Sequence, residues 1–267
     1  MTKIAVLGGG NLGRALACGW VGAGRFEAGD IRVTRRQADK LDDLHERGFH
    51  TGSDNLAAIR DAELVVISVQ PQQLDELLSE IASGLDERRH RVISVVTGVS
   101  IAQIRSRIGA RVPLVLAMPN TAVAICESMT CLAADDESAD ALQEATELFD
   151  LVGRTLVIQE EMMAPATALC ACGVAFFLRC IRAASQGGIE IGFHPEDALL
   201  LASQTARGAA SLSLRQGSHP EGEIDRVTTP RGCTIVGLNE MEHRGLSSAL
   251  IKGLIVSARA AEGLYSQ

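Results

Sequence analysis

Three glycines near the start of the chain have the spacing of a loop that binds nucleotide phosphates. The apolar run Ile4–Leu7 is followed by Gly8, Gly10 and Gly13 in a G-x-G-x-x-G pattern, and a helical pattern begins at Arg14. In such a unit the first glycine permits a tight turn, the second lets backbone amides approach a pyrophosphate, and the third lets helix and strand pack closely. A plain glycine-rich turn is the simpler alternative, but the strand, turn and helix context favours a dinucleotide site.

Basic residues stand where such a site selects between NAD and NADP. Thr34, Arg35 and Arg36 follow the second apolar run, about twenty residues beyond the glycines. A NAD site usually offers Asp or Glu here for the ribose 2′-hydroxyl, whereas guanidinium groups pair with phosphate through charge-assisted bonds. The arginines therefore predict NADPH, with NADH as the weaker alternative, although a solvated basic strand end has the same composition.

A second candidate site is the stretch Val227–Leu238, far along the chain. It joins threonine hydroxyls, a proline and a glycine at a predicted helix start. Free amides at a helix N-terminus bind anions, and a substrate carboxylate is a natural guest. The stretch offers no obvious nucleophile or base, because a threonine hydroxyl without a neighbouring histidine is poor at either task. An N-cap followed by a turn is the alternative interpretation.

The elements that must position these residues alternate between strands and helices over residues 1–160. The predicted strands are apolar at nearly every position, which is typical of a sheet covered on both faces. The pattern predicts an α/β fold whose N-terminal part is a Rossmann-like, doubly wound parallel sheet. We expect strands at Ile4–Leu7, Ile31–Thr34, Leu64–Val69, Val92–Val96, Val112–Met118 and Thr155–Ile158, and helices at Gln37–Arg47, Gln72–Gly84, Ile101–Arg107 and Asp140–Leu151.

Strand patterns end after about residue 160, and residues 161–267 predict an all-α C-terminal domain. A long helix is expected over Met162–Gly192, with a kink near Gly173 or the Gly187–Gly188 pair. Small residues on these helices permit close approach and favour a homodimer or higher homo-oligomer. The further helices are expected from Pro195 to about Arg215, over Thr234–Arg244 and over Ser247–Glu262, with a loop at Gln216–Thr229.

Composition narrows the function classes. The 267 residues are 46% hydrophobic, carry a net charge of −8 and include one Trp and one Tyr, which argues against nucleic acid as a partner. No apolar run approaches the length of about 20 residues that spans a membrane, and no export signal is evident, so we expect a cytoplasmic protein without a membrane partner. The odd number of cysteines predicts small buried residues rather than a disulfide framework, and the Cys170–Cys172 spacing predicts no metal site.

Four stretches together resemble the pyrroline-5-carboxylate reductase family. They are the glycine loop, Ser68–Pro71, Ala117–Ala122 and Val227–Leu238, and the likeness extends over the whole chain. The resemblance implies an oxidoreductase that uses NADPH to reduce a cyclic imine carboxylate, 1-pyrroline-5-carboxylate, to L-proline in proline biosynthesis. It also implies that the helical domain builds the dimer and that the substrate pocket borrows residues from the partner subunit.

The resemblance also implies roles for individual residues. Thr229, Gly232, Cys233 and Thr234 would hold the substrate carboxylate, and the Thr234 hydroxyl would lie near the ring nitrogen as the catalytic group. Little else is needed, because a protonated imine is already a strong electrophile and positioning supplies most of the rate. The six histidines are expected on surface loops and helices. The implied cofactor residues are Gly8, Gly10, Asn11, Leu12, Thr34, Arg35, Arg36, Asn55, Val69, Gln70, Pro71, Met118 and Asn120.

Departures from the family pattern keep two other functions open. One is a related NADP-dependent reductase for a different cyclic imine acid or small carbonyl acid, although the catalytic lysine of hydroxyacid dehydrogenases is absent from Met162–Arg182. The other is a non-catalytic NADP-binding homologue. Hydroxyl losses and a bulky cation change the lining of the implied pocket, which affects specificity more than fold. The departures are at Gln70, Leu116, Ala122, Cys170, Cys172, Phe176, Arg231 and Cys233.

Overall fold

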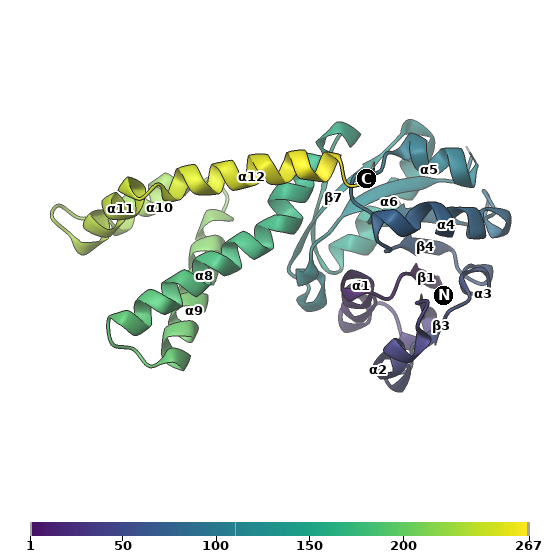
Figure 1. Ribbon diagram of the computed structural model, residues 1–267, viewed down its shortest axis with the longest axis horizontal. Helices are drawn as coiled ribbons and strands as arrows, with labels where there is room; N and C mark the ends of the chain where they lie inside the picture. The colour runs from purple at the N-terminus through teal and green to yellow at the C-terminus, as the bar shows by residue number, and fades with distance from the viewer. Residues whose placement is uncertain (1, 110, 266–267) are drawn as a thin grey trace. The chain divides into compact units, whose positions relative to one another are not determined.

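The computed structural model (Figure 1) describes residues 2–109 and 111–265. Residues 1, 110 and 266–267, which include the outer ends of both expected domains, lie outside the described part. The chain divides into one unit of residues 1–172 with 255–267 and a second unit of residues 173–254. The domain boundary that the sequence predicts at residue 160 stays a prediction.

An eight-stranded sheet forms the centre of the first unit, in the order β3-β2-β1-β4-β5-β6-β7-β8. The first six strands are parallel, as expected, but β7 is antiparallel to β6 and β8 is parallel to β7. The pattern missed β3, which has three residues, and β7, which is rich in small residues. The strands are β1 (Ile4–Leu7), β2 (Ile31–Thr34), β3 (His50–Gly52), β4 (Leu64–Ile67), β5 (Arg91–Ser94), β6 (Leu114–Met118), β7 (Ser128–Ala134) and β8 (Gly153–Val157).

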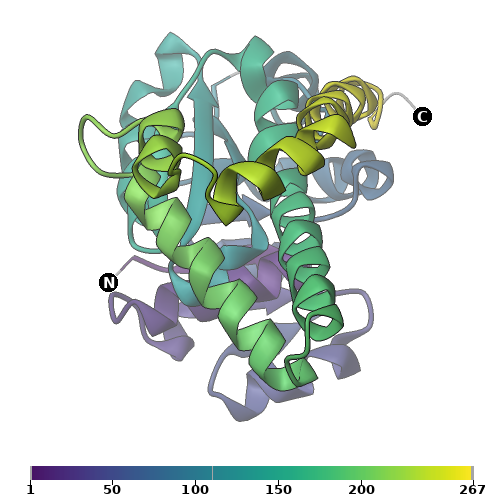
Figure 2. The same cartoon turned by 90° about the vertical axis from the view of Figure 1, so that its left-hand side faces the viewer.

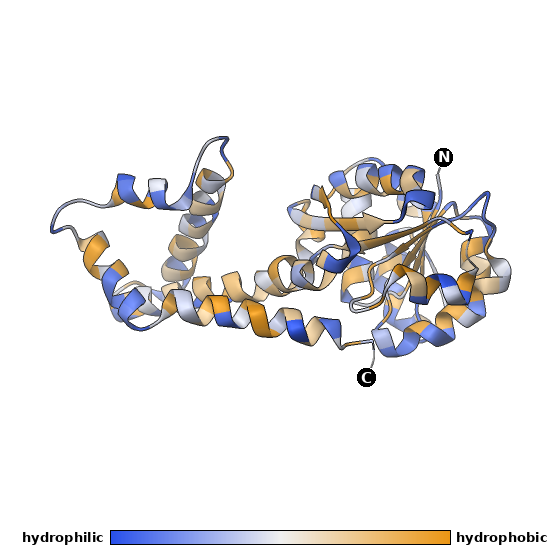
Figure 3. Ribbon diagram, turned by 90° about the horizontal axis from the view of Figure 1, so that it is seen from above, coloured by the Kyte–Doolittle hydropathy of each residue, from blue (hydrophilic) through white to orange (hydrophobic). Residues whose placement is uncertain are grey.

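Helices cover both faces of this sheet, which confirms the doubly wound prediction. Ile4 and Val6 of β1 share an apolar cluster with α1 (Asn11–Gly22) and α6 (Ala139–Asp150). The alternate residues of β1, Ala5 and Leu7, belong to a second cluster. Figure 3 shows the strands of the sheet coloured mostly as hydrophobic. The second cluster is formed with α3 (Asn55–Arg60), α4 (Pro71–Ile81) and α5 (Ile101–Ile108).

Short helices complete the first unit. The helix expected at Gln37–Arg47 is a 3-10 turn, Ala38–Leu41, followed by α2 (Asp42–Glu46). The other 3-10 turns are Ala28–Asp30, Ala82–Gly84, Thr121–Ile125, Asp136–Ser138 and Glu160–Met162.

The long helix expected after the last strand is present with a local irregularity. After α7 (Met163–Ala166), the backbone is π-helical over Thr167–Cys172 and then continues as α8 (Gly173–Glu190). The irregularity therefore directly precedes Gly173, one of the two expected positions, whereas α8 continues through the other. π-Helical turns are uncommon and occur frequently at functional sites.

The expectation that no segment has the length and composition of a membrane span was wrong. The helical run Glu160–Glu190 is long and apolar enough to cross a membrane by those two criteria. Length and composition do not separate a membrane span from a helix whose apolar face packs on protein. The expectation was based on uninterrupted apolar runs, and polar residues interrupt the apolar residues in this segment. A membrane-spanning helix of this length tolerates such polar residues.

The second unit is helical. Helices α8 and α9 (Pro195–Ser213) pack side by side, as Figure 2 shows, and they line an apolar cavity of about 540 Å³. The loop expected at Gln216–Thr229 instead contains α10 (Pro220–Val227), which begins with a proline and has acidic residues in its first turn, both favourable at a helix start. The remaining helices are α11 (Cys233–His243) and α12 (Leu246–Glu262).

Two expectations about residue types need correction. His90 is buried, and its ring accepts from the Asp86 amide through Nδ1 and donates to the Ile59 carbonyl through Nε2. Burial lowers the pKa of His90, although the Ile59 contact opposes this. The other five histidines are exposed. Of the seven cysteines, only Cys131 is buried in the single chain. Three are half-buried (Cys18, Cys170 and Cys172), and three are exposed (Cys126, Cys180 and Cys233).

We expect Gly13→Ala to destabilise the protein and Gly10→Ala to leave it largely intact. A methyl group at Gly13 would lie 2.2 Å from the Gly8 carbonyl oxygen, whereas one at Gly10 would meet no atom within 4 Å. The first change should lower the free energy of unfolding by about 2 kcal/mol or more, the second by less than about 1 kcal/mol. Urea unfolding followed by circular dichroism measures both, and equal losses would contradict this packing.

Candidate functional site

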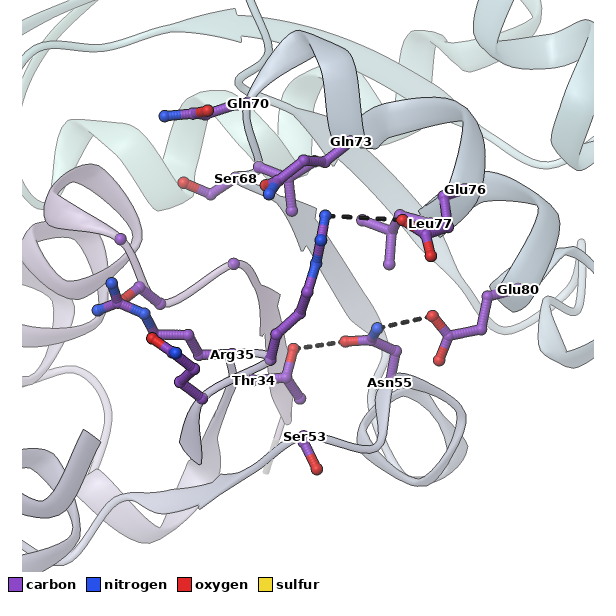
Figure 4. Close-up of a pocket in the computed structure, with 16 residues that line it drawn as sticks. Thr34, Arg35, Ser53, Asn55, Ser68, Gln70, Gln73, Glu76, Leu77 and Glu80 are labelled. Atoms are coloured by element: carbon purple, nitrogen blue, oxygen red, sulfur yellow. Dashed lines mark hydrogen bonds and ion pairs between the residues drawn. The ribbon is translucent and has the colours of Figure 1, made fainter. Parts of the chain in front are cut away.

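A cavity of about 570 Å³ lies at the carboxyl ends of β1, β2 and β4 (Figure 4). From β1 the chain crosses first to β2 on one side and later to β4 on the other. Ligands of open α/β sheets bind at such a switch point. The lining residues are Gly8, Gly9, Gly10, Thr34, Arg35, Arg36, Gln37, Ser53, Asn55, Ser68, Val69, Gln70, Gln73, Glu76, Leu77 and Glu80.

The glycine loop has the geometry expected of its first and third glycines. Gly8 has φ of +115°, and a Cβ there would lie 2.2 Å from the Ser68 carbonyl oxygen. The amides of Gly8 and Gly9 both donate to the Thr34 carbonyl, at 3.1 and 2.7 Å. Gly13 lies against the Gly8 carbonyl. These contacts confirm a tight turn and a close approach of α1 to the sheet.

The N-terminus of α1 opens towards the cavity without a side-chain cap. Gly10 is its N-cap residue, and the first turn contains no acidic residue. In contrast, Asp54 and Ser100 cap α3 and α5 by accepting from backbone amides. Uncapped amides at the positive end of a helix dipole bind anions. This end of the cavity therefore suits a phosphate group.

A hydrogen-bonded chain fixes the opposite wall of the cavity. The Thr34 hydroxyl donates to Asn55 Oδ1 at 2.6 Å, and Asn55 Nδ2 donates to Glu80 Oε2 at 2.9 Å. Figure 4 shows these two contacts as dashed lines. Both polar ends of the Asn55 amide are thus used, and its orientation is set by β2 and α4.

The two arginines at the end of β2 have different partners. Arg35 Nη1 donates to the Gly9 carbonyl oxygen at 3.2 Å, so this side chain reaches back to the glycine loop. Arg36 forms an ion pair with Glu76 of α4 at 3.6 Å, and both side chains are largely exposed. An anion that binds Arg36 must therefore compete with Glu76.

Several lining residues were missed by the motif-based prediction. Gln73, Glu76, Leu77 and Glu80 all come from α4. Their spacing of three or four residues puts them on one face of a helix, and that spacing in Gln72–Gly84 is the signal from which they were identifiable. Ser53 follows the end of β3 and carries no pattern of its own, whereas Ser68 begins the stretch Ser68–Pro71, whose resemblance to the family did not single it out.

Five of the implied cofactor residues do not line the cavity. Asn11 and Leu12 lie in the first turn of α1, and Pro71 is the first residue of α4. Met118 and Asn120 are buried at the end of β6. The Asn120 side chain accepts from the Ala122 amide at 2.9 Å and donates to the Cys170 carbonyl at 3.2 Å.

The second candidate site is a tight turn that leads into α11. The Gly232 amide donates to the Thr229 carbonyl at 2.9 Å, and Arg231 has φ of +60°. Proline at the second position and a positive φ at the third describe a type II turn, in which glycine is preferred at the third position. A Cβ at Gly232 would lie 2.4 Å from Thr229 Oγ1.

This turn also exposes a helix N-terminus. Gly232 is the N-cap residue of α11, with no side-chain cap and no acidic residue in the first turn. Thr234 is half-buried in that turn, while Thr229 and Cys233 are exposed. The turn lies wholly in the unit of residues 173–254, and the cavity lies in the other unit.

Two family descriptions match the chain. Residues 160–264 match pyrroline-5-carboxylate reductase dimerisation, and residues 3–98 match NADP oxidoreductase, coenzyme F420-dependent. The helical region thus matches the dimerisation domain, and the N-terminal part of the sheet matches the NADP oxidoreductase domain.

Two curated relatives align with this chain over nearly its full length. Pyrroline-5-carboxylate reductase 2 of Dictyostelium discoideum is 49% identical over 272 residues, which cover 96% of this chain and 91% of the relative. Reductase 1 of the same organism is 49% identical over 276 residues, 99% of this chain, and the chain spans about half (50%) of its length.

A solved structure shows the same fold. The Plasmodium falciparum pyrroline carboxylate reductase with NADP bound has a TM-score of 0.90 and 21% identity, and the match covers 99% of this chain and 98% of that one. The identity to the Dictyostelium relatives decides the family, and this structural match decides the architecture. The chain belongs to the pyrroline-5-carboxylate reductase family.

Proposed function

We propose that this protein is an NADPH-dependent pyrroline-5-carboxylate reductase that forms L-proline. The observation that carries the proposal is the uncapped N-terminus of α1 at one end of the cavity, with Arg35 and Arg36 at another. This arrangement suits a dinucleotide with an extra phosphate on its adenosine ribose. The names of the Dictyostelium relatives supply the substrate.

The residues present fit such a cofactor. Gly8, Gly10, Asn11 and Leu12 would hold the pyrophosphate, since the space above Gly10 is open. Arg35 and Arg36 would bind the 2′-phosphate. In this proposal, the further contacts come from Thr34, Asn55, Val69, Gln70 and Pro71, with Met118 and Asn120 beside the nicotinamide.

The chemistry requires position more than acid–base groups. NADPH supplies a hydride when bound, and a protonated cyclic imine accepts it at carbon. We assign the carboxylate of the imine to the turn formed by Thr229, Gly232 and Cys233, which leads into the uncapped N-terminus of α11. The Thr234 hydroxyl then holds the ring nitrogen and its proton. Fixing both groups orients the imine carbon, which is the main catalytic contribution expected here.

We also propose that the active form is a homodimer in the cytoplasm, built through the C-terminal helices. Support comes from the dimerisation match at residues 160–264 and from the exposed apolar side chains Phe177, Leu200 and Ile255. A partner chain packed on α8 would also cover exposed apolar side chains of this helix, such as Phe177, which lies within the apolar run Glu160–Glu190. The substrate turn would complete the site within that dimer.

The direct test is steady-state oxidation of NADPH with a panel of cyclic imine acids and small keto acids. We expect the highest kcat/KM with 1-pyrroline-5-carboxylate. Turnover of another imine acid alone would assign a related reductase instead. NADPH binding without turnover of any member would identify a non-catalytic homologue.

Thr234→Ala tests the substrate turn in the same assay. We expect kcat to fall about tenfold to a hundredfold, because a hydrogen bond to the reacting group is lost. The affinity for NADPH should stay the same, and Thr234→Ser should restore most of the rate because it keeps the hydroxyl. An unchanged rate in Thr234→Ala would remove this residue from the mechanism.

The Arg36–Glu76 ion pair gives a test of cofactor selectivity. Arg36→Ala should weaken NADPH binding about tenfold or more, because a charge-assisted phosphate contact is lost, with little effect on NADH. Glu76→Gln should tighten NADPH binding about two- to fivefold, because it frees Arg36 from an exposed ion pair.

Equilibrium titration of cofactor fluorescence measures both constants without any substrate. Glu87→Gln is the matched control, since this exposed residue makes the same charge change outside the cavity. Equal changes for NADPH and NADH in the Arg36 variant would contradict the assignment of the 2′-phosphate.

A further inference from the structure

Two cysteines far apart in the sequence meet in the first unit. The Sγ atoms of Cys131, in β7, and Cys170, in the π-helical turn, lie 3.7 Å apart. Cys131 is 4% exposed, whereas Cys170 is half-buried and reachable by a small reagent. The pair is therefore one accessible thiol with a second thiol directly behind it.

The surroundings connect this pair to the proposed nicotinamide side of the site. Cys131 is paired with Met118 across the β6–β7 ladder, and both pack in a small apolar cluster with Ala166. The carbonyl of Cys170 accepts the Asn120 side-chain amide at 3.2 Å. A change in the distance between the two sulfurs would thus act on residues next to the proposed reaction centre.

The two thiols differ in acidity in the way that a reactive pair requires. The hydrogen bond from Cys131 stabilises the Cys170 thiolate and lowers the pKa of Cys170 to about 7. The same hydrogen bond, together with burial, raises the pKa of Cys131. A thiol with a pKa near ambient pH is close to the optimum for attack, because about half of it is ionised and the thiolate is still nucleophilic. Cysteines that sense oxidants combine these properties with a neighbouring thiol.

We propose that Cys131 and Cys170 are a reversible modification site that closes to a disulfide on reaction with hydrogen peroxide. The Cys170 sulfur attacks a peroxide oxygen, the O–O bond breaks, and the departing hydroxide takes up the Cys170 proton as water. The Cys131 sulfur then attacks the resulting sulfenic acid, the S–S bond forms, and hydroxide leaves with the Cys131 proton as a second water. The two thiols lose two electrons, which reduce one hydrogen peroxide to two waters.

Closure of the disulfide would act on residues next to the proposed reaction centre. A disulfide has an S–S length of about 2.05 Å, so the sulfurs must approach each other from 3.7 Å. Rotation of the two cysteine side chains, with or without a shift of the π-helical turn or β7, brings this about, and Asn120 and Met118 contact these two segments. A displacement of about 1 Å can cost about a hundredfold in rate. On the basis of the proposed function, we expect the disulfide form to lose at least about tenfold in turnover and dithiothreitol to restore it.

The test treats the full-length protein with equimolar hydrogen peroxide, blocks free thiols and maps the peptides by mass spectrometry. We expect one linked pair, Cys131 with Cys170, that disappears with dithiothreitol. Linkage of Cys170 to Cys172, or a Cys170 sulfinic acid beside an alkylated Cys131, would overturn the proposal. This map uses the unmodified sequence and does not depend on the folding of any variant.

Variants and turnover extend the same experiment. Cys131→Ser should abolish the linked pair, and Cys172→Ser, the matched control, should retain it. Full turnover of the linked protein would overturn the effect on the site. If the reduced protein reduces no imine, the proposed function fails, whereas the peptide map still decides whether the disulfide forms.

Discussion

The close approach of α1 to strands β1 and β4 is the contact on which the cavity depends. Gly13 lies directly against the Gly8 carbonyl, and Gly8 lies against the Ser68 carbonyl at the end of β4. Side chains at these two positions would force the helix away from the sheet, because backbone atoms cannot move aside as flexible side chains can. The contact sets the direction of the uncapped amides at the start of α1, so the anion site follows from the packing of three backbone segments rather than from any charged side chain.

Charged side chains of both signs also line the cavity. Arg35 and Arg36 end β2, and Glu76 and Glu80 face them from α4. Glu80 holds Asn55 in place, while Glu76 occupies Arg36. A phosphate that binds here replaces an existing ion pair, which makes selectivity between two cofactors a difference between two similar interactions. The family assignment and the cavity therefore agree on a dinucleotide, and in our proposal Glu76 of α4 sets how strongly its 2′-phosphate is preferred.

Strands and helices could be predicted from the sequence where the local residue pattern agrees with the tertiary structure. Buried parallel strands such as Ile4–Leu7 and Ile31–Thr34 were predicted to the residue, because apolar β-branched runs and glycine turns are local signals. Strand β3 and helix α10 were missed, since one is too short for a periodic signal and the other lies in a polar stretch. The approach of Glu76 to Arg36 and of Cys131 to Cys170 depends on segments that meet only in the fold. No pattern in either segment alone contains that information.

We propose above that this protein transfers a hydride from NADPH to the imine carbon of 1-pyrroline-5-carboxylate. The most direct measurement traces the hydrogen atom that NADPH transfers to the imine. Purified protein is incubated with 1-pyrroline-5-carboxylate and NADPH that carries deuterium on both C4 positions, and the proline is analysed by mass spectrometry. We expect proline with one deuterium on the ring carbon that was doubly bonded to nitrogen. Unlabelled proline, or no proline at all, would contradict it.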